Sequence, residues 1–241
     1  MSDATNSGTD SESNSNSLNT FTETDPQFEC LYPLFDCNNN DDDMCEEDVS
    51  ESNEHCGECD NPCNGNCFNG ECVVRKYAFL TEDMEKGNLG GLLAADEMCQ
   101  QQASVAGLPG IYRAWLSTGS SNPESRFTSS PNGYMMPNGS LLATSWNDLT
   151  DGSLANKLNI TQHGDLIDYG PECIGTRVWS NTTIDGETLN DTLDCQQWLF
   201  DSLVLSGNVG NPGSGEDAWT ADDFCSPQKC NTFKHLYCFQ Q

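Results

Sequence analysis

The chain has 241 residues, enough for one or two domains, and its 38 acidic and 9 basic side chains give a formal net charge of −29. Residues 1–74 hold 18 of the acids and no Lys or Arg, whereas residues 75–241 combine 20 acids with all 9 bases, a net charge of −11. Such a surface repels phosphate backbones, heparin-like sulfates and anionic lipid, which argues against nucleic acid or heparin as a partner.

Fourteen cysteines point to an oxidising compartment. Zinc is the alternative, because Cys56-Gly-Glu-Cys59 has the spacing of a metal-ligand pair. We favour disulfides, because no His-x3-His follows and the neighbouring cysteines are irregularly spaced. No apolar run is long enough to span a bilayer, and the first residues do not resemble a signal peptide. We therefore expect a secreted or outer-cell-surface protein whose export signal, with any lipid anchor, has been trimmed.

Residues 1–28 contain almost no apolar side chains and are predicted to be a disordered acidic spacer. Residues 29–74 carry eight cysteines, which allow four bridges in 105 possible pairings. Because so short a segment has little core, the bridges must order it, and we interpret it as a disulfide-rich stalk. The stretch HCGECDNPCNGNCFNGECV resembles a Cys-Gly repeat of secreted myxobacterial proteins, which suggests a bacterial surface protein.

An alternating series in the same segment has the ligand types of a calcium loop: Asp36, Asn38, Asn40 and Asp42. The EF-hand pattern also needs a glycine for the sharp turn and a distal glutamate, and neither is in place. We therefore interpret this series as a solvated acidic loop.

Residues 75–241 are predicted to form the main domain, with a core large enough for independent folding. A helix is predicted after Asn88, because five side chains share one face: Ala95, Met98, Cys99, Gln102 and Ala106. Asp96 and Glu97 are expected near its start, where the helix dipole favours acids. Gly107 and Pro109 should end the helix before a strand over 111–116.

Two further apolar runs, residues 77–80 and 235–241, are interpreted as neighbouring strands that bring the ends of the domain together. A Cys99–Cys238 bridge would then join the helix to the closing strand. Between these elements the sequence predicts a loop over 117–140 and a short helix capped by Ser145 and ending at 151–152. It also predicts a strand over 177–180, a turn at 185–186 and a long flexible loop over 205–218.

Four stretches resemble, in the same order, the segments of endostatin, the C-terminal domain of collagens XV and XVIII: ADEMCQQQASVAGLPGIYRAWLS, SLLATSWNDLTDG, VWSNTTIDGETLNDTLDCQQW and HLYCFQQ. The pattern is also similar to bacterial endostatin-like domains, including leptospiral endostatin-like surface lipoproteins. The resemblance implies an α+β, C-type-lectin-like fold with a mixed, mostly antiparallel sheet and flanking helices.

The resemblance also implies three bridges: Cys99–Cys238, Cys195–Cys230 and, from the cysteines left over, Cys173–Cys225. Two departures bear on function. The arm over residues 73–80 lacks the histidines that hold zinc in endostatin, and the domain has only four Arg where endostatin has a heparin-binding arginine cluster. Zinc and heparin are therefore not expected here.

No catalytic motif is present, and we predict that the protein is not an enzyme. His163 beside Asp165 could contribute to a Ser-His-Asp set, but the Gly-x-Ser-x-Gly motif, HExxH and phosphate-binding glycine loops are missing. His55 and His235 are interpreted as structural. Four Asn-x-Ser/Thr sequons matter only in a host that glycosylates them: Asn138, Asn159, Asn181 and Asn190.

An acidic cluster around one tryptophan is the candidate ligand-binding site: Glu216, Asp217, Trp219, Asp222 and Asp223. It resembles, with altered spacing, the Trp-Asn-Asp calcium and sugar site of C-type lectins, and an exposed acidic loop is the alternative. We place the binding surface on residues 203–224, with Trp219 as an exposed anchor or, alternatively, packed in the core.

The prediction is therefore a non-catalytic adhesion module that binds an extracellular protein or glycan. The leptospiral resemblance suggests matrix proteins or complement regulators as partners. A calcium-dependent lectin is the first alternative and a structural envelope protein the second. No cofactor is expected apart from this calcium option.

Overall fold

The computed structural model describes residues 30–40, 42, 45–168, 170, 173 and 175–241. The spacer predicted for residues 1–28 therefore lies outside the described residues. Within the described residues the protein is α+β, as the sequence predicts, with short helices and several small sheets around one five-stranded sheet. None of the described helices has the length and apolar character needed to cross a membrane.

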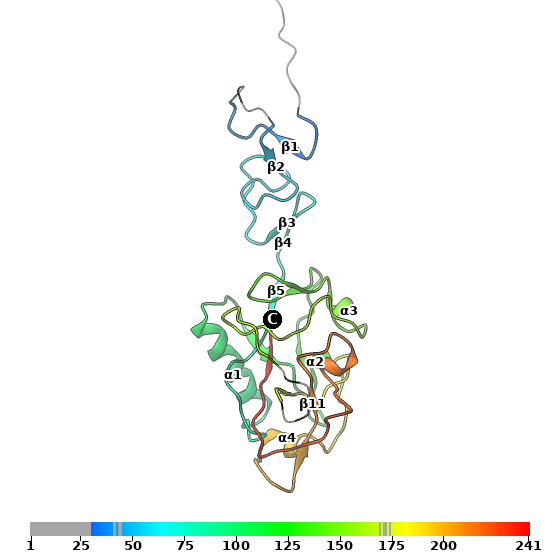
Figure 1. The fold of residues 1–241 in the computed structure, drawn as a ribbon. Coiled ribbons are helices and arrows are strands. Elements are labelled where there is room, and N and C mark those ends of the chain that lie inside the picture. Colours follow the sequence, from blue (N-terminus) through cyan, green and yellow to red (C-terminus); the bar gives the residue numbers. More distant parts are fainter. Residues whose placement is uncertain (1–29, 41, 43–44, 169, 171–172, 174) are drawn as a thin grey trace, which may run out of the picture.

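The disulfide-rich segment consists of two small hairpins that project from one end of the larger part of the protein (Figure 1). Strand β1 (Leu34–Phe35) pairs with β2 (Glu47–Asp48), and β3 (Asn66–Phe68) pairs with β4 (Glu71–Val73). Four bridges hold the segment together: Cys30–Cys45, Cys37–Cys59, Cys56–Cys67 and Cys63–Cys72. Cys56 and Cys59 thus bond to different partners, which supports disulfides over the zinc alternative.

The main sheet has the strand order β6-β13-β5-β7-β8. Its strands are β6 (Tyr112–Ala114), β13 (Tyr237–Gln240), β5 (Lys76–Leu80), β7 (Tyr134–Met135) and β8 (Leu141–Ala143). Only the β5–β7 pair is parallel among these neighbours, so the predicted mixed, mostly antiparallel character is confirmed. The closing strand lies between β5 and β6, with Cys238 opposite both Phe79 and Ala114.

The alternation of side chains sends the two faces of this sheet into separate cores. Phe79, Tyr112 and Cys238 pack with helix α1 (Leu92–Val105) in one core. Trp115, Phe239 and their neighbours fill the other, where Trp115 lies 5.3 Å from Phe239 and 5.0 Å from Trp219 between ring centroids. Both faces of the strand after the helix are therefore buried, on the two sides that the alternation predicts.

Helix α1 begins after two glycines at positive φ, Gly90 and Gly91, and ends before Gly107, which has the predicted left-handed conformation (φ 71°). Its buried side chains are Ala95, Cys99 and Ala103, one row of residues four apart. The start at Leu92 leaves no acidic residue in the first turn. The expected placement of Asp96 and Glu97 at the helix start is therefore wrong.

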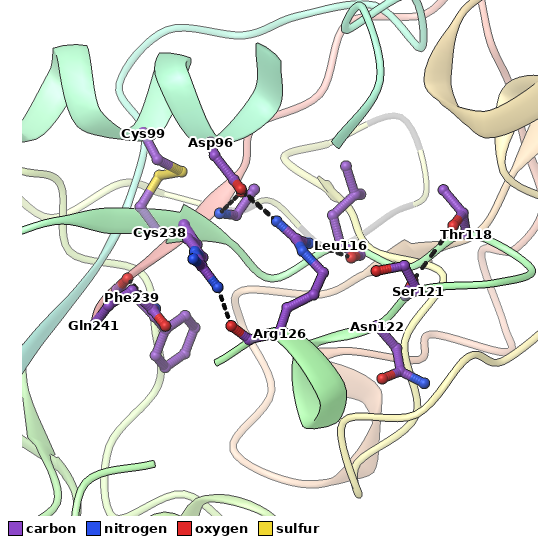
Figure 2. A network of polar contacts seen from close by, with 12 residues as sticks. Asp96, Cys99, Leu116, Thr118, Ser121, Asn122, Arg126, Cys238, Phe239 and Gln241 are labelled. Atoms are coloured by element: carbon purple, nitrogen blue, oxygen red, sulfur yellow. Dashed lines mark hydrogen bonds and ion pairs between the residues drawn. A yellow bond between two sulfur atoms is a disulfide. The ribbon is translucent and has the colours of Figure 1, made fainter. Parts of the chain in front are cut away.

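Asp96 instead organises a polar network between α1, β6 and helix α2 (Pro123–Arg126) (Figure 2). Its carboxylate accepts a hydrogen bond from the Ala114 amide at 2.9 Å and two from the Arg126 guanidinium at 2.5 and 2.6 Å. Arg126 also donates to the Leu116 carbonyl, and Arg113 donates to the carbonyl of Arg126. In this largely buried pair one guanidinium nitrogen, Nη2, contacts both carboxylate oxygens, and such charge-assisted hydrogen bonds are stronger than neutral ones.

The remaining elements are short. They are α3 (Trp146–Leu149), β9 (Val178–Trp179), α4 (Cys195–Trp198), β10 (Ser206–Gly207), β11 (Val209–Gly210), the 3-10 helix η1 (Asp217–Trp219) and β12 (Gln228–Lys229). Helix α3 has the predicted Ser145 cap, whose hydroxyl accepts from the Asp148 amide. The three bridges of this part are Cys99–Cys238, Cys173–Cys225 and Cys195–Cys230, as the resemblance implied.

The long flexible loop expected over 205–218 is wrong, because this stretch is paired and packed. Strand β10 pairs with β12, and β11 pairs with β9. A Cβ at Gly207 would lie 3.1 Å from both the Trp179 and the Trp198 rings, and one at Gly210 would collide with the Trp219 carbonyl. These glycines therefore serve close packing and not flexibility.

Candidate functional site

Trp219, the expected exposed anchor, is fully buried. Its ring packs against Trp115 and against Tyr237, whose hydroxyl donates to the Trp219 carbonyl at 2.9 Å. Helix η1 turns the side chain inward to complete the second core. The prediction of an exposed Trp219 is therefore wrong, and the alternative, that Trp219 packs in the core, is confirmed.

Asp222 is also buried, and it forms an ion pair with Arg177. Its carboxylate lies 3.0 Å from the Arg177 Nε and also accepts from the Cys225 amide at 3.3 Å. Burying a carboxylate is costly unless it is paired and hydrogen-bonded, and both conditions are met here. Asp222 therefore holds the β9–β11 region to the Cys173–Cys225 bridge instead of pointing toward a ligand.

The other three acids of the cluster, Glu216, Asp217 and Asp223, are exposed to solvent. With Asp222 turned inward, the cluster does not converge on one point. Over the described ranges, no group of three or more His, Cys, Asp or Glu side chains is placed to hold a metal ion. This cluster therefore does not provide a converging set of calcium ligands.

The two asparagines of the calcium-like series in the disulfide-rich segment use their side-chain oxygens within the chain. Asn38 Oδ1 accepts from the Asn40 amide at 2.7 Å, and Asn40 Oδ1 accepts from the Asp42 amide at 3.3 Å. Such turns, in which an asparagine or aspartate caps the amide two residues on, are a common loop device. Residues 41, 43 and 44 lie outside the described residues.

The histidines have separate surroundings. His163 and Asp165 are exposed, and the backbone amides of both donate to the Thr161 hydroxyl. His235 is buried and its Nδ1 donates to the Thr81 carbonyl at 2.5 Å. Burial lowers the pKa of His235, and Lys234 adds to the effect, so the ring is neutral at pH 7. We assign this buried side chain a structural role.

A feature that the sequence analysis missed lies at α4. Four successive residues without glycine, Cys195 to Trp198, have φ between 51° and 61° and form a left-handed turn. Left-handed conformation costs roughly 1–2 kcal/mol for each such residue. Strain of this size persists only where the surroundings determine the backbone, and it often accompanies functional surfaces.

Several contacts hold this turn in place. The Cys195–Cys230 bridge fixes its first residue, and Asp194 accepts from the Gln197 amide at 3.0 Å. The Trp198 indole donates to the Ser117 carbonyl at 2.8 Å, and the Trp198 carbonyl accepts from two amides before α1, those of Leu89 and Gly91. The turn is therefore rigidly tied to the core.

The left-handed turn directs the following residues outward. Four large apolar side chains of the segment 199–205, which we call the tip loop, are exposed: Leu199 (46%), Phe200 (50%), Leu203 (73%) and Val204 (84%). Single exposed apolar residues are ordinary, but a run of them within one short loop is typical of interaction surfaces. The turn α4, from which the tip loop continues, lies at the end of the protein opposite the disulfide-rich segment (Figure 1).

An open groove of about 680 Å³ runs beside the tip loop. Its apolar lining residues are Leu199, Phe200 and Leu205. Its polar lining residues include Asp191 and the two glutamines of the left-handed turn, Gln196 and Gln197. We call it the tip groove. Residues 203–205 fall within the loop that the sequence analysis selected, but the exposed apolar residues and the groove lie mostly N-terminal to it.

No protein-family model matches this sequence, and no curated protein is significantly similar to it. The functional argument therefore depends on the surfaces described above.

Proposed function

We propose that this protein is a non-catalytic, extracellular or cell-surface binding module that recognises a protein partner through the tip loop. The observation that carries the proposal is the cluster of exposed apolar side chains at the end opposite the stalk. The tip loop continues from α4, which lies at the opposite end of the described protein from the disulfide-rich segment (Figure 1). The seven disulfides suit an extracellular environment.

A protein partner suits the tip loop better than a glycan does. Leu199, Leu203 and Val204 offer aliphatic surface, whereas a sugar site needs several directed polar groups around an aromatic face. Covering the exposed fractions of the four side chains would contribute roughly 5 kcal/mol at about 2 kcal/mol for each fully buried side chain. Association itself costs at least about 4 kcal/mol, so a partner needs further contacts, which the tip groove would supply.

The endostatin-like family remains part of the proposal. The order of helix, strand and closing strand, the mixed sheet and the three implied bridges all support it. The family supplies no ligand, because a fold does not by itself determine a function. Nothing in the buried Asp222 or the dispersed acids favours the calcium-dependent lectin alternative.

The proposal can be tested with random 12-residue peptides displayed on phage and selected on the immobilised full chain. The tip variant is Leu203→Ser with Val204→Ser. Its matched control is Leu93→Ser with Val105→Ser, which removes two equally exposed apolar side chains (80% and 72%) from α1.

We expect the selected peptides to bind the parent and the control equally, and the tip variant at least tenfold more weakly. Failure to select any peptide would contradict the proposal. So would a set of peptides that binds the tip variant as well as the parent.

A further inference from the structure

The tip groove has the volume and the mixed apolar and polar lining of a site for side chains. Its volume of about 680 Å³ lies within the range of ligand pockets and exceeds what one apolar side chain fills. Leu199, Phe200 and Leu205 provide an apolar side, and Leu205 is also packed against the first core. The lining therefore combines exposed side chains, Leu199 and Phe200, with one that packs against the core, Leu205.

The polar side of the groove offers unused hydrogen-bonding groups. Gln196 and Gln197 are exposed, and their side-chain amides have no hydrogen-bond partner among the described residues. Each amide can both donate and accept, which is what the backbone of an extended peptide requires. The left-handed turn fixes the backbone of both residues, so little order has to be gained at this point when a ligand binds.

Asp191 gives the groove a negative charge, and the two lysines that contact the tip loop have other partners. The Asp191 side chain is exposed and makes no ion pair or hydrogen bond within the described ranges. Lys86 is paired with Asp201 at 3.3 Å and lies over the Phe233 ring, whereas Lys229 donates to Val204 and Ser206. The free carboxylate therefore complements a cation on the ligand.

The charge of the whole chain acts in the same direction. With a net charge of −29, the protein attracts cationic partners over a distance and repels sulfated, phosphorylated or anionic-lipid surfaces. A groove lined by apolar side chains and a free carboxylate is thus matched by an apolar side chain next to a lysine or arginine.

We propose that the tip groove binds an extended polypeptide segment in which an apolar side chain lies next to a basic one. The apolar side chain lies against Leu199 and Phe200, and the basic one pairs with Asp191. Gln196 and Gln197 bind the peptide backbone. This inference rests on the proposed function, because it names the class of segment that the tip recognises.

The test uses the full chain and an array of ten-residue Gly/Ser peptides in which two neighbouring positions take every pair of amino acids. We expect the strongest signals for Leu, Ile, Phe or Met next to Lys or Arg. The best peptide is then measured in solution against the parent, Asp191→Asn and Asp165→Asn. Asp165 is an exposed carboxylate outside the groove, so its variant has the same net charge as Asp191→Asn.

We expect Asp191→Asn to weaken binding about three- to fivefold, in the range of a solvent-exposed ion pair, and Asp165→Asn to leave it unchanged. The loss should shrink as salt is added. It should also vanish for a peptide whose basic residue is replaced by leucine. Phe200→Ser, which removes the apolar side, should weaken binding of both peptides.

The outcomes separate the two proposals. Binding that needs Phe200 but shows no preference for a basic residue, or is unchanged in Asp191→Asn, overturns this inference and leaves the tip as a binding surface. Peptide binding that is insensitive to Phe200→Ser, or absent from the whole array, contradicts the proposed function as well. Phe200-dependent binding to zwitterionic lipid vesicles in place of peptides would also overturn the inference, because a membrane would then be the partner.

Discussion

The strongest consequence of the structure for stability concerns Asp222, which the sequence placed among the candidate ligands. Removing its carboxylate in Asp222→Ala leaves the Arg177 guanidinium buried without its counter-charge, since the two side chains are only 6% and 4% exposed. Breaking a buried pair by deleting one partner typically costs about 3–5 kcal/mol. For a domain of this size that corresponds to a fall in Tm of roughly 10 °C.

The measurement is thermal and urea unfolding with the disulfides intact, in the presence of either calcium or EDTA. Asp223→Ala is the control, because its exposed neighbouring carboxylate should change the free energy of unfolding by no more than about 0.5 kcal/mol. The double variant Arg177→Met with Asp222→Leu should regain much of the loss, because no unpaired charge remains.

Two results would refute this reasoning. The first is equal Tm values for Asp222→Ala and Asp223→Ala, which would mean that the buried pair contributes nothing. The second is a parent protein that calcium stabilises and an Asp222→Ala variant that it does not, which would restore Asp222 as a metal ligand.

Three further predictions follow from the fold. Asp96→Ala should destabilise the protein by about 2–3 kcal/mol in urea unfolding, because the Arg126 guanidinium and the Ala114 amide lose their acceptor. Replacing the exposed Glu97 with alanine should be nearly neutral, and equal effects of the two substitutions would contradict the network. Residues 74–241 should fold alone with three bridges, because no bridge crosses residue 73. An unfolded product, or mispaired cysteines found by mass mapping, would refute this. Burial lowers the pKa of His235 below its ordinary 6.5, so the unfolded chain binds the proton more readily and stability should fall as the pH drops below about 6.5. His235→Gln should lose less stability than the parent over that interval, and parallel pH profiles would be the contrary result.

The periodic parts of the fold could be predicted because their signals are local. The face of α1, the left-handed stop at Gly107 and the capped helix after Ser145 each depend on residues within a few positions of one another. The position of Asp96 could not be predicted in this way, because its partners are 18 and 30 residues away in sequence. From sequence, an acid near a helix start is assigned to the helix dipole. Only the tertiary structure shows that Asp96 instead binds the Ala114 amide and Arg126.

The main error in the predicted fold is the flexible loop over 205–218, and it came from the glycines of that stretch. The stretch SGNVGNPGSGED predicts a flexible loop on composition, yet Gly207 and Gly210 are placed where any side chain would meet tryptophan rings or a backbone carbonyl. Glycine is favoured both where a chain must move and where another group must come close. Sequence alone does not separate these two uses, whereas a burial pattern does.

The tip loop was missed for a related reason. Leu199-Phe-Asp-Ser-Leu-Val-Leu205 has the composition of a core strand, and a single sequence gives no signal for a left-handed turn of four residues that lack glycine. Trp198 is the residue that makes the turn possible, because its ring packs 5.6 Å from Trp179 while its carbonyl binds the chain before α1. Trp198 is buried, whereas the two apolar residues that follow it, Leu199 and Phe200, are exposed. The contacts of Trp198 with Trp179 and with the chain before α1 hold the left-handed turn in place, and the exposed tip loop begins directly after it. The binding function that we propose for the tip loop therefore depends on the rigidity of this turn.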